Sequence, residues 1–402
     1  MFKGKRQGKT DCTMRDYVSK IAKDLKPSGI RKFFDLCAGS PDIISLGVGE
    51  PDFVTPWQIS SAGINAIKQG RTTYTANAGL LDLRKEICDY LKRFNLEYKP
   101  NEVMVTIGAS EVIDISLRAI INPGDEILVP DPSYVSYAPC IELCGGVPVS
   151  VECVSDNGFI LTPEKLEAVI TEKTKALIFP YPNNPTGGIM TKEEIERIIP
   201  VLKKHEILVI SDEIYAELTY GGNQHVSICS FDIPCVLING FSKAFAMTGW
   251  RVGYICCKGD LYKAMLKIHQ YSIICAPIFS QYAALEGLKK GKLNDYAFVK
   301  EMRDEYDRRR IFMYNSFNEM GLSCFEPRGA FYIMPCVKSL NMDGQEFALK
   351  LLEKKKVAVV PGDAFGQSGK YFFRCSYAYS MKSLIKAVSL IREFVEETRG
   401  EM

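Results

Sequence analysis

The segment ALIFPYPNNPTGGIMTKEEIERIIPVLKKHEILVISD (176–212) decides the fold, because it contains a complete strand-helix-strand pattern. Two short apolar runs, ALIFP (176–180) and ILVISD (207–212), flank a longer stretch whose apolar residues recur at helical spacing. Strands joined through a helix run parallel, and strands without polar alternation are buried on both faces. The segment therefore predicts a buried parallel sheet that is covered by helices.

Capping residues predict where the helices begin. Thr191 is followed three residues later by Glu194, which forms a capping box, and Pro200 is expected to help end this helix. Thr162 and Pro163 are suited to the N-cap and first position of another helix.

The same alternation continues on both sides of the segment. Further strands are predicted at VMVTIG (103–108), EILVP (126–130) and VLING (236–240), and further helices at LDLRKEICDYLKRF (81–94) and EVIDISLRAII (111–121). Alternating strands and helices predict an α/β fold with a mainly parallel sheet. In such sheets, ligands bind beyond the carboxyl ends of the strands.

The composition excludes several classes of protein. The chain has 402 residues, of which 47% are hydrophobic, and a formal net charge of +2. This balance gives no basis for binding nucleic acid or an anionic membrane. No run of about 18 apolar residues predicts a membrane span. The basic start MFKGKRQGKT is not followed by the apolar run of a secretory signal. We expect a cytoplasmic enzyme.

Cysteine and histidine do not indicate a metal site. The fourteen cysteines include no C-x-x-C pair, and His205, His225 and His269 have no ligand spacing. We expect buried, reduced thiols and no bound metal.

Each predicted strand end carries a polar group. Gly108-Ala109-Ser110 follows VMVTIG and enters a helix, where free amides favour an anion, although such a turn can also be only a cap. Asn184 lies in a Pro- and Asn-rich turn. Asp212 ends an apolar strand, where it needs a cationic partner or caps a helix.

Lys243 follows VLING and lies among small and aromatic residues, with Arg251 eight positions later. A lone lysine is usually a surface charge. In an apolar site near a second cation, however, its pKa falls, which suits Schiff-base chemistry. A phosphate-binding turn, an amide, a carboxylate and this lysine together match the needs of pyridoxal phosphate, whose ring nitrogen requires a carboxylate partner.

Seven segments resemble those of the class I aminotransferases of fold type I, and the resemblance in order and spacing extends from about residue 15 to the C-terminus. They are SLGVGEPDF (45–53), TTYTANAGLLDLR (72–84), YPNNPTGG (181–188), SDEIY (211–215), FSKAFAMTGWRVGY (241–254), GAFY (329–332) and FRCSYA (373–378). SGIRKFF (28–34) and EMRDEYDRRR (301–310) resemble aromatic and aspartate aminotransferases in particular. The resemblance implies a pyridoxal-phosphate enzyme.

The resemblance also implies roles for single residues. Lys243 would bind the cofactor as a Schiff base and move protons, and Asp212 would pair with the pyridinium nitrogen. Tyr215 and Asn184 would hydrogen-bond the ring hydroxyl, and Tyr134, in DPSYVSY (131–137), would stack on the ring.

For the phosphate and the substrate, the resemblance implies a second set of residues. The phosphate would be held by Gly108, Ala109, Ser110, Ser242 and Arg251, with Tyr74 reaching in from the other subunit of a homodimer. Arg374 would bind the α-carboxylate of the substrate with the help of the Gly49 amide.

Two other enzyme classes compete with this interpretation. For a nicotinamide dehydrogenase, Gly47 and Gly49 would begin a dinucleotide loop, but Asp52 stands where the third glycine is required. A pyridoxal-phosphate lyase that breaks a C–S bond or closes an aminocyclopropane ring would share nearly every residue, so it stays open as the alternative.

We therefore expect the pyridoxal-phosphate-dependent transferase fold type I, with a mainly parallel seven-stranded sheet. Residues 45–290 would form the large domain, and residues 1–44 with 291–402 a smaller α+β domain. The expected reaction is ping-pong amino transfer from an L-amino acid to a 2-oxo acid, with 2-oxoglutarate as the expected acceptor and with aromatic amino acids, aspartate or a broad range as donors. Some relatives with acidic substrates have a lysine at the position of Ser110, and the lack of this lysine argues against strict specificity for aspartate. The segment SGIRKFF (28–34) favours aromatic or broad specificity.

Overall fold

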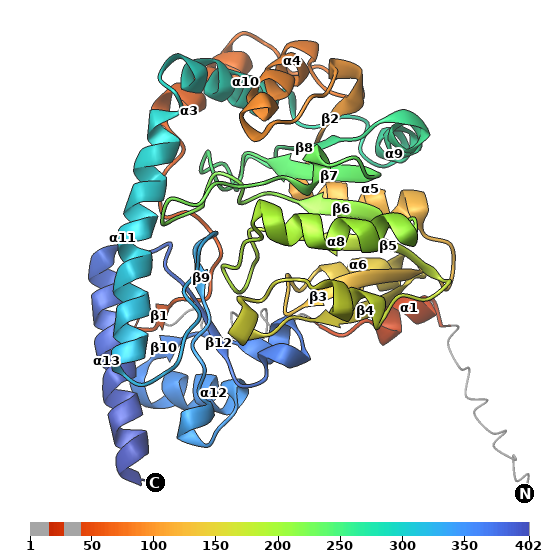
Figure 1. Ribbon diagram of the computed structural model, residues 1–402. Helices are drawn as coiled ribbons and strands as arrows, with labels where there is room; N and C mark the ends of the chain where they lie inside the picture. The colour runs from red at the N-terminus through yellow and green to blue at the C-terminus, as the bar shows by residue number, and fades with distance from the viewer. Residues whose placement is uncertain (1–15, 28–41, 402) are drawn as a thin grey trace, which may run out of the picture.

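A seven-stranded sheet forms the centre of the molecule (Figure 1), whose computed structural model describes residues 16–27 and 42–401. The strand order is β2-β8-β7-β6-β5-β3-β4. The strands are β2 (Val103–Thr106), β3 (Glu126–Asp131), β4 (Val147–Glu152), β5 (Thr174–Phe179), β6 (Leu208–Asp212), β7 (Cys235–Gly240) and β8 (Gly253–Cys256). Strand β8 runs in the opposite direction to the other six strands of this sheet. The prediction of a mainly parallel sheet of seven strands is confirmed.

Helices cover the sheet and extend beyond it (Figure 1). They are α1 (Lys20–Asp24), α3 (Trp57–Lys68), α4 (Leu81–Leu91), α5 (Gly108–Ile120), α6 (Tyr137–Leu143), α7 (Pro163–Glu167), α8 (Lys192–Lys204), α9 (Gly259–Ser272), α10 (Ile278–Leu293), α11 (Ala297–Glu319), α12 (Gly344–Lys355) and α13 (Met381–Glu401).

Strand β5 shows why the sheet is buried on both faces. Successive side chains of a strand point to opposite faces. Ala176 and Ile178 accordingly belong to the core cluster that includes α5, while Leu177 and Phe179 belong to the cluster that includes α8. All four side chains are at most 1% exposed. Burying each of the larger ones contributes about 1.5–3 kcal/mol.

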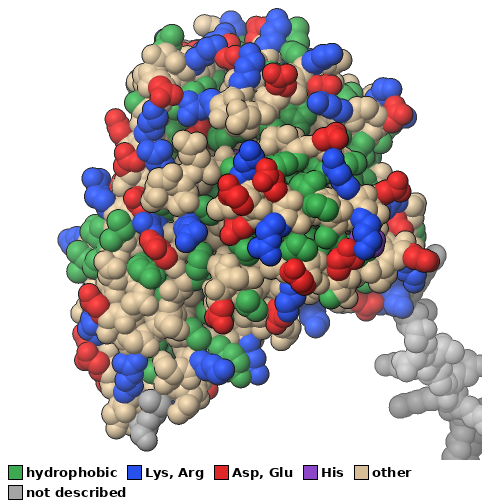
Figure 2. All heavy atoms as spheres, viewed as in Figure 1, with side chains coloured by type: hydrophobic (Ala, Val, Ile, Leu, Met, Phe, Trp, Pro, Cys, Tyr) green, Lys and Arg blue, Asp and Glu red, His purple; other side chains and the backbone are tan. Residues whose placement is uncertain are grey.

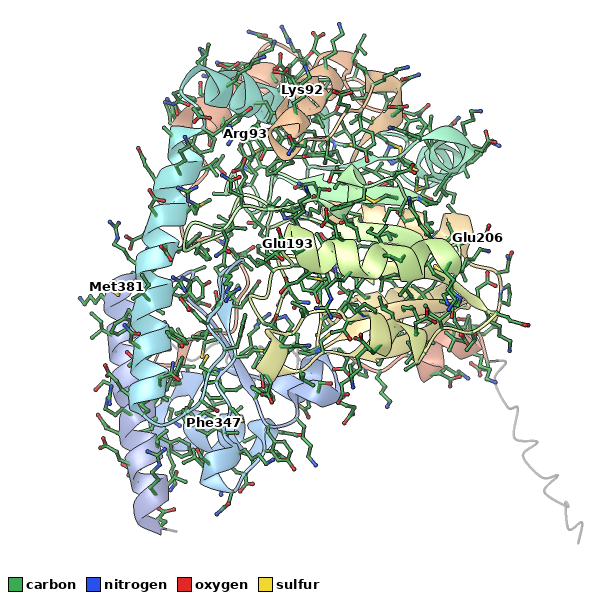
Figure 3. The ribbon with its side chains drawn as sticks, viewed as in Figure 1. Lys92, Arg93, Glu193, Glu206, Phe347 and Met381 are labelled. Atoms are coloured by element: carbon green, nitrogen blue, oxygen red, sulfur yellow. A yellow bond between two sulfur atoms is a disulfide. The ribbon has the colours of Figure 1, made fainter. Side chains whose placement is uncertain are left out.

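The predicted helix starts are confirmed, but one predicted helix end is wrong. The side chains of Thr191 and Glu194 form the capping box of α8, and Thr162 caps α7 with Pro163 at its start. Helix α8 nevertheless continues through Pro200 to Lys204. Apolar residues on both sides of Pro200 are buried against the sheet, which holds the helix together despite the missing amide hydrogen. In Figure 3 this helix runs without a break from Glu193 towards Glu206, which follows its end.

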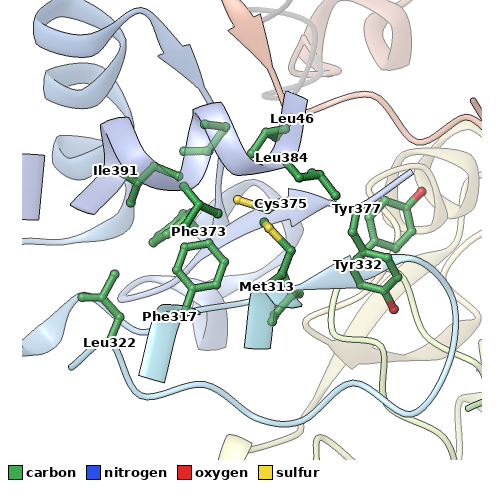
Figure 4. Close-up of a cluster of buried hydrophobic side chains, with 14 of the residues drawn as sticks. Leu46, Met313, Phe317, Leu322, Tyr332, Phe373, Cys375, Tyr377, Leu384 and Ile391 are labelled. Atoms are coloured by element: carbon green, nitrogen blue, oxygen red, sulfur yellow. The ribbon is translucent and has the colours of Figure 1, made fainter. Parts of the chain in front are cut away.

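The C-terminal part of the chain forms a second core (Figure 4). A three-stranded sheet, in the order β11-β12-β9, consists of β9 (Tyr332–Ile333), β11 (Val360–Pro361) and β12 (Phe373–Ser376). Strand β1 (Ile44–Ser45) pairs with β10 (Val357–Ala358). Side chains from α11, α13 and β12, including Phe317, Leu384 and Phe373, meet in one buried cluster. The domain boundary at residue 290 stays a prediction, and that residue lies near the end of α10.

The expectation that the cysteines are reduced and buried is wrong for some of them. Cys229 and Cys235 form a disulfide, since the loop before β7 brings their Cα atoms to 5.6 Å, a separation that such bonds span. Other cysteines, such as Cys88 and Cys275, are only partly buried.

The surface of the molecule carries charges of both signs. Figure 2 shows basic and acidic side chains interspersed over the face in view. Within residues 16–27 and 42–401, no helix has the length and apolar character needed to cross a bilayer. The same residues contain no group of three or more His, Cys, Asp or Glu side chains placed to hold a metal ion.

Candidate active site at the carboxyl ends of the strands

A cavity of about 980 Å³ opens beyond the carboxyl ends of β5, β6 and β7 and beside the start of α5. The structure brings most of the predicted site residues together here. The predicted residues in its wall are Gly49, Ala109, Ser110, Tyr134, Asn184, Asp212, Tyr215, Ser242, Lys243, Arg251 and Arg374. Gly108 lies next to this wall, and Tyr74 lies outside it, with 78% of its surface exposed.

Lys243 lies three residues after the end of β7 and is partly buried in the cavity. Its Nζ atom donates a hydrogen bond to the carbonyl oxygen of Gly49 at 2.7 Å. Burial lowers the pKa of the Lys243 amine to about 8; Glu50 opposes this shift, and the positive charge of Arg251 adds to it. The neutral, nucleophilic amine is therefore far more populated near neutral pH than that of an exposed lysine.

Asp212 ends β6, and its carboxylate is buried in the wall of the cavity. It accepts hydrogen bonds from the hydroxyl of Tyr137 at 2.8 Å and from the amide of Ile214 at 3.3 Å. Burial raises the pKa of Asp212 to about 6, although the Tyr137 hydrogen bond opposes the rise. A turn follows Asp212, so the alternative role as a helix cap is not found. A cation in the cavity would restore the charged carboxylate.

The start of α5 is built to approach an anion closely. Gly108 has a φ of 70°, and a Cβ atom there would lie 2.7 Å from Nη2 of Arg251. A Cβ atom at Gly253 would lie 2.8 Å from the amide nitrogen of Ala109. Two glycines thus let the Arg251 guanidinium and the free amides of the first helical turn converge, which is the arrangement that binds phosphate groups.

Arg374 lies on β12 and is a buried cation with uncharged partners. Its Nη1 donates to Oδ1 of Asn184 at 2.8 Å, and its Nη2 donates to the carbonyl oxygen of Gly47. Its Nε has no partner among the described residues. Burial lowers the pKa of the guanidinium. A buried cation without a counter-charge is costly, so an incoming carboxylate would be bound strongly here.

Four tyrosines complete the wall of the cavity. The Tyr215 hydroxyl lies 2.8 Å from the hydroxyl of Tyr332, and burial raises the pKa of Tyr215 well above its ordinary value. The Tyr134 ring meets the Tyr137 ring edge to face, with centroids 5.5 Å apart.

Two of these tyrosines, Tyr137 and Tyr332, were given no role by sequence reasoning, although each lies in a motif quoted above. The signal for Tyr137 is its position three residues after Tyr134 in DPSYVSY (131–137), at the start of a helix that packs beside β3 and β4. Tyr332 lies in another sheet, so no local pattern links it to the strand ends.

Comparison with known proteins places the chain in a family. The profile of the family "Aminotransferase class I and II" matches residues 41–391. The chain belongs to the class I and II aminotransferases. It is therefore an enzyme, a transaminase, with the fold type I of the pyridoxal-phosphate-dependent transferases, and the lyase alternative is not favoured.

Individual aminotransferases resemble the chain over nearly its full length. A putative aminotransferase of Bacillus subtilis, YugH, is 50% identical over 96% of this chain and 100% of its own length. An aspartate aminotransferase of Pyrococcus abyssi is 42% identical over 93% of this chain and 97% of its own. The crystal structure of an aromatic aminotransferase from Pyrococcus horikoshii has a TM-score of 0.87, with 39% identity over 92% of this chain and 99% of its own.

Proposed function

We propose that this aminotransferase uses pyridoxal 5'-phosphate in the cavity described above to transfer an amino group from an L-amino acid to a 2-oxo acid. The expected acceptor is 2-oxoglutarate, and the reaction is ping-pong. The observation that carries the proposal is the convergence of Lys243, Asp212 and the uncompensated cation of Arg374 on one cavity.

The residues fit the cofactor in size and in chemistry. A volume of about 980 Å³ accommodates a small cofactor together with a substrate. The start of α5, with Arg251, Ser110 and Ser242, would hold the phosphate. Asp212 would face the ring nitrogen, whose positive charge would remove the cost of burying the carboxylate. Tyr215 and Asn184 would hydrogen-bond the ring hydroxyl, and Tyr134 would lie against the ring.

Bound pyridoxal phosphate supplies an electron sink that weakens the bonds at the α-carbon of an amino acid. Arg374 would fix the substrate by its α-carboxylate, with the Gly49 amide alongside, and so orient the α-hydrogen toward Lys243. The amine of Lys243, with its lowered pKa, is suited to accept that proton. It would return the proton two atoms away, which is the 1,3-proton shift that amino transfer requires.

The range of donors is proposed to be aromatic or broad. Lys243, Arg251 and Arg374 are the lysine and arginine side chains in the described part of the cavity wall, and each already has a role. No described lining cation therefore remains for the second carboxylate of aspartate, and Ser110 is uncharged. The segment SGIRKFF (28–34), which favours aromatic or broad specificity, lies outside the described residues.

A homodimer with shared active sites is part of this proposal. Tyr74 is exposed, as are Val54 (88%) and Trp57 (71%), which follow the cavity-lining segment directly. A second copy would cover these side chains and allow Tyr74 to reach the partner's phosphate site. The cytoplasmic location stays a prediction.

A donor panel tests the proposed function. The enzyme should be loaded with the cofactor and assayed with aromatic, acidic and aliphatic amino acids, with and without 2-oxoglutarate. We expect the 2-oxo acid of each donor to form only when the acceptor is present. Release of pyruvate and ammonia without an acceptor would contradict the proposed reaction. A rate with aspartate about a hundredfold higher than with phenylalanine and tyrosine, a difference of about 2.7 kcal/mol, would contradict the proposed aromatic specificity.

A further inference from the structure

We propose, resting on the function proposed above, that Tyr332 is a positioning residue with two separable tasks. Its hydroxyl orients the hydroxyl of Tyr215, and its ring holds the guanidinium of Arg374. One side chain would thus link the cofactor-facing phenol to the group that binds the substrate carboxylate.

The backbone places Tyr332 beside Arg374. Tyr332 on β9 is paired with Ser376 on β12, and Arg374 lies two residues before Ser376. Residues two apart on a strand share a face, so Tyr332 and Arg374 are diagonal neighbours on the same face of this sheet. Figure 4 shows the Tyr332 ring at the edge of the aliphatic cluster, with its hydroxyl directed away from it.

The ring of Tyr332 holds the guanidinium in place. The Cζ atom of Arg374 lies 4.4 Å from the centroid of the Tyr332 ring and 4.7 Å from that of Phe365. Aromatic faces attract a guanidinium and leave its edge free for hydrogen bonds. The two rings therefore restrain Arg374 without using the N–H groups that a carboxylate requires.

The hydroxyl of Tyr332 acts on the other side of the cavity. It lies 2.8 Å from the hydroxyl of Tyr215, and both side chains are at most 5% exposed. When Tyr332 donates to Tyr215, the hydrogen of Tyr215 is free to point at an acceptor in the cavity. Consecutive hydroxyls also polarise one another, so Tyr332 makes Tyr215 a stronger donor.

Gly49 shows how tightly this position is constrained. A Cβ atom at residue 49 would overlap the hydroxyl of Tyr332, and the carbonyl oxygen of Gly49 accepts the hydrogen bond from Lys243. The Tyr332 hydroxyl is thus fixed between the segment that contacts Lys243 and the phenol of Tyr215.

Two substitutions separate the two tasks in the cofactor-loaded enzyme. Tyr332→Phe removes the hydroxyl and keeps the ring, so kcat should fall about three- to tenfold while KM for the amino acid stays the same. The pH at which the visible absorbance of the bound cofactor changes should also rise, because Tyr215 becomes a weaker donor. Tyr332→Leu also removes the ring, so KM and the calorimetric Kd of 3-phenylpropionate should rise about three- to thirtyfold.

Matched variants serve as controls. Phe365→Leu should raise KM without moving the absorbance titration, because Phe365 contacts Arg374 and not Tyr215. Tyr377→Phe removes a buried hydroxyl that bonds to the carbonyl of Ala330 outside the cavity wall, so it should change neither quantity. Tyr332→Phe and Phe365→Leu keep both tasks testable if Tyr332→Leu does not fold.

Each task can be overturned independently. An absorbance titration and kcat of Tyr332→Phe equal to those of Tyr377→Phe would refute the hydroxyl task. Unchanged ligand affinity in a folded Tyr332→Leu and in Phe365→Leu would refute the ring task. A wild-type enzyme that transaminates no donor would refute the proposed function itself, which is a separate outcome.

Discussion

The hydroxyl of Tyr137 donates a 2.8 Å hydrogen bond to Oδ2 of Asp212, at the end of strand β6. Tyr137 comes from the first turn of α6, so a helix on one side of the sheet orients a carboxylate at its edge. This contact stabilises the charged form of Asp212 in a place where burial raises its pKa to about 6. The contact therefore keeps the carboxylate ready for a cationic ligand.

Substitution of Asp212 should separate catalysis from cofactor attachment. Asp212→Asn removes the negative charge that faces the ring nitrogen, so kcat should fall at least about 10²-fold. Tyr137→Phe should act in the same direction and cost about three- to tenfold, because it removes one hydrogen bond to the carboxylate. Steady-state kinetics on the loaded variants measures both effects, and the absorbance of the lysine-bound cofactor should persist in both.

Asp131 offers a matched control for Asp212. It is also a buried carboxylate at a strand end, but it accepts hydrogen bonds from the amides of Gln367 and Ser368 and does not line the cavity. Asp131→Asn should lower the free energy of unfolding by about 1–3 kcal/mol and leave turnover of the folded enzyme unchanged. Equal losses of turnover in both variants would show that the Asp212 effect is not specific.

The pKa of Lys243 predicts a pH dependence for cofactor capture. Burial lowers this pKa from 10.5 to about 8, and only the neutral amine attacks an aldehyde. In the cofactor-free protein, the rate of capture should therefore rise about tenfold per pH unit below pH 8 and level off above it. Stopped-flow absorbance after mixing with pyridoxal phosphate measures this rate. A rise that continues to about pH 10 would indicate an unperturbed lysine instead.

Arg374→Lys should weaken substrate binding more than it slows the chemical step. Lysine keeps the charge, but it loses the planar fork and the stacking on Tyr332 and Phe365. KM for the amino acid should rise about 10- to 100-fold, while kcat changes less. Arg310→Lys is the control, because Arg310 is also buried but pairs with Asp307 and Glu326 on α11 and its flanking loop. A similar rise of KM in that control would argue against a specific role for Arg374.

Trp57→Glu tests the proposed homodimer. The side chain is 71% exposed at the start of α3, and a charge there would be buried against a second copy. Sedimentation should show a monomer, and the monomer should bind the cofactor more weakly because Tyr74 no longer reaches the partner's site. Ile385→Glu on α13 changes another exposed apolar residue (53%) and should leave the dimer intact. A monomeric wild type would contradict the prediction.

The sheet could be predicted from the sequence wherever a strand is apolar on both faces. β5, β6 and β7 are continuous buried runs, so their pattern is unambiguous. β4 was missed because it is an edge strand with mostly exposed or half-buried residues. β8 was missed because it is only four residues long and because the composition of the chain does not change between the Lys243 loop and this strand.

The candidate site was predictable to the extent that it lies at strand ends. Lys243 and Asp212 each follow an apolar strand, and this pattern alone is enough to place both at one edge of a parallel sheet. Tyr332 lies 117 residues from Tyr215, and only the folded chain brings the two hydroxyls together. Contacts of this kind depend on packing between segments that are far apart in the chain, which no local pattern encodes.

Attachment of the cofactor to Lys243 is tested by identifying the lysine that binds it. The enzyme should be loaded with pyridoxal phosphate, reduced with borohydride to fix the cofactor on its lysine, digested and analysed by mass spectrometry. We expect the reduced cofactor on the peptide that contains Lys243, and we expect a folded Lys243→Ala variant to acquire no label and to show no turnover. Label on any other lysine, or an active Lys243→Ala variant, would contradict this attachment.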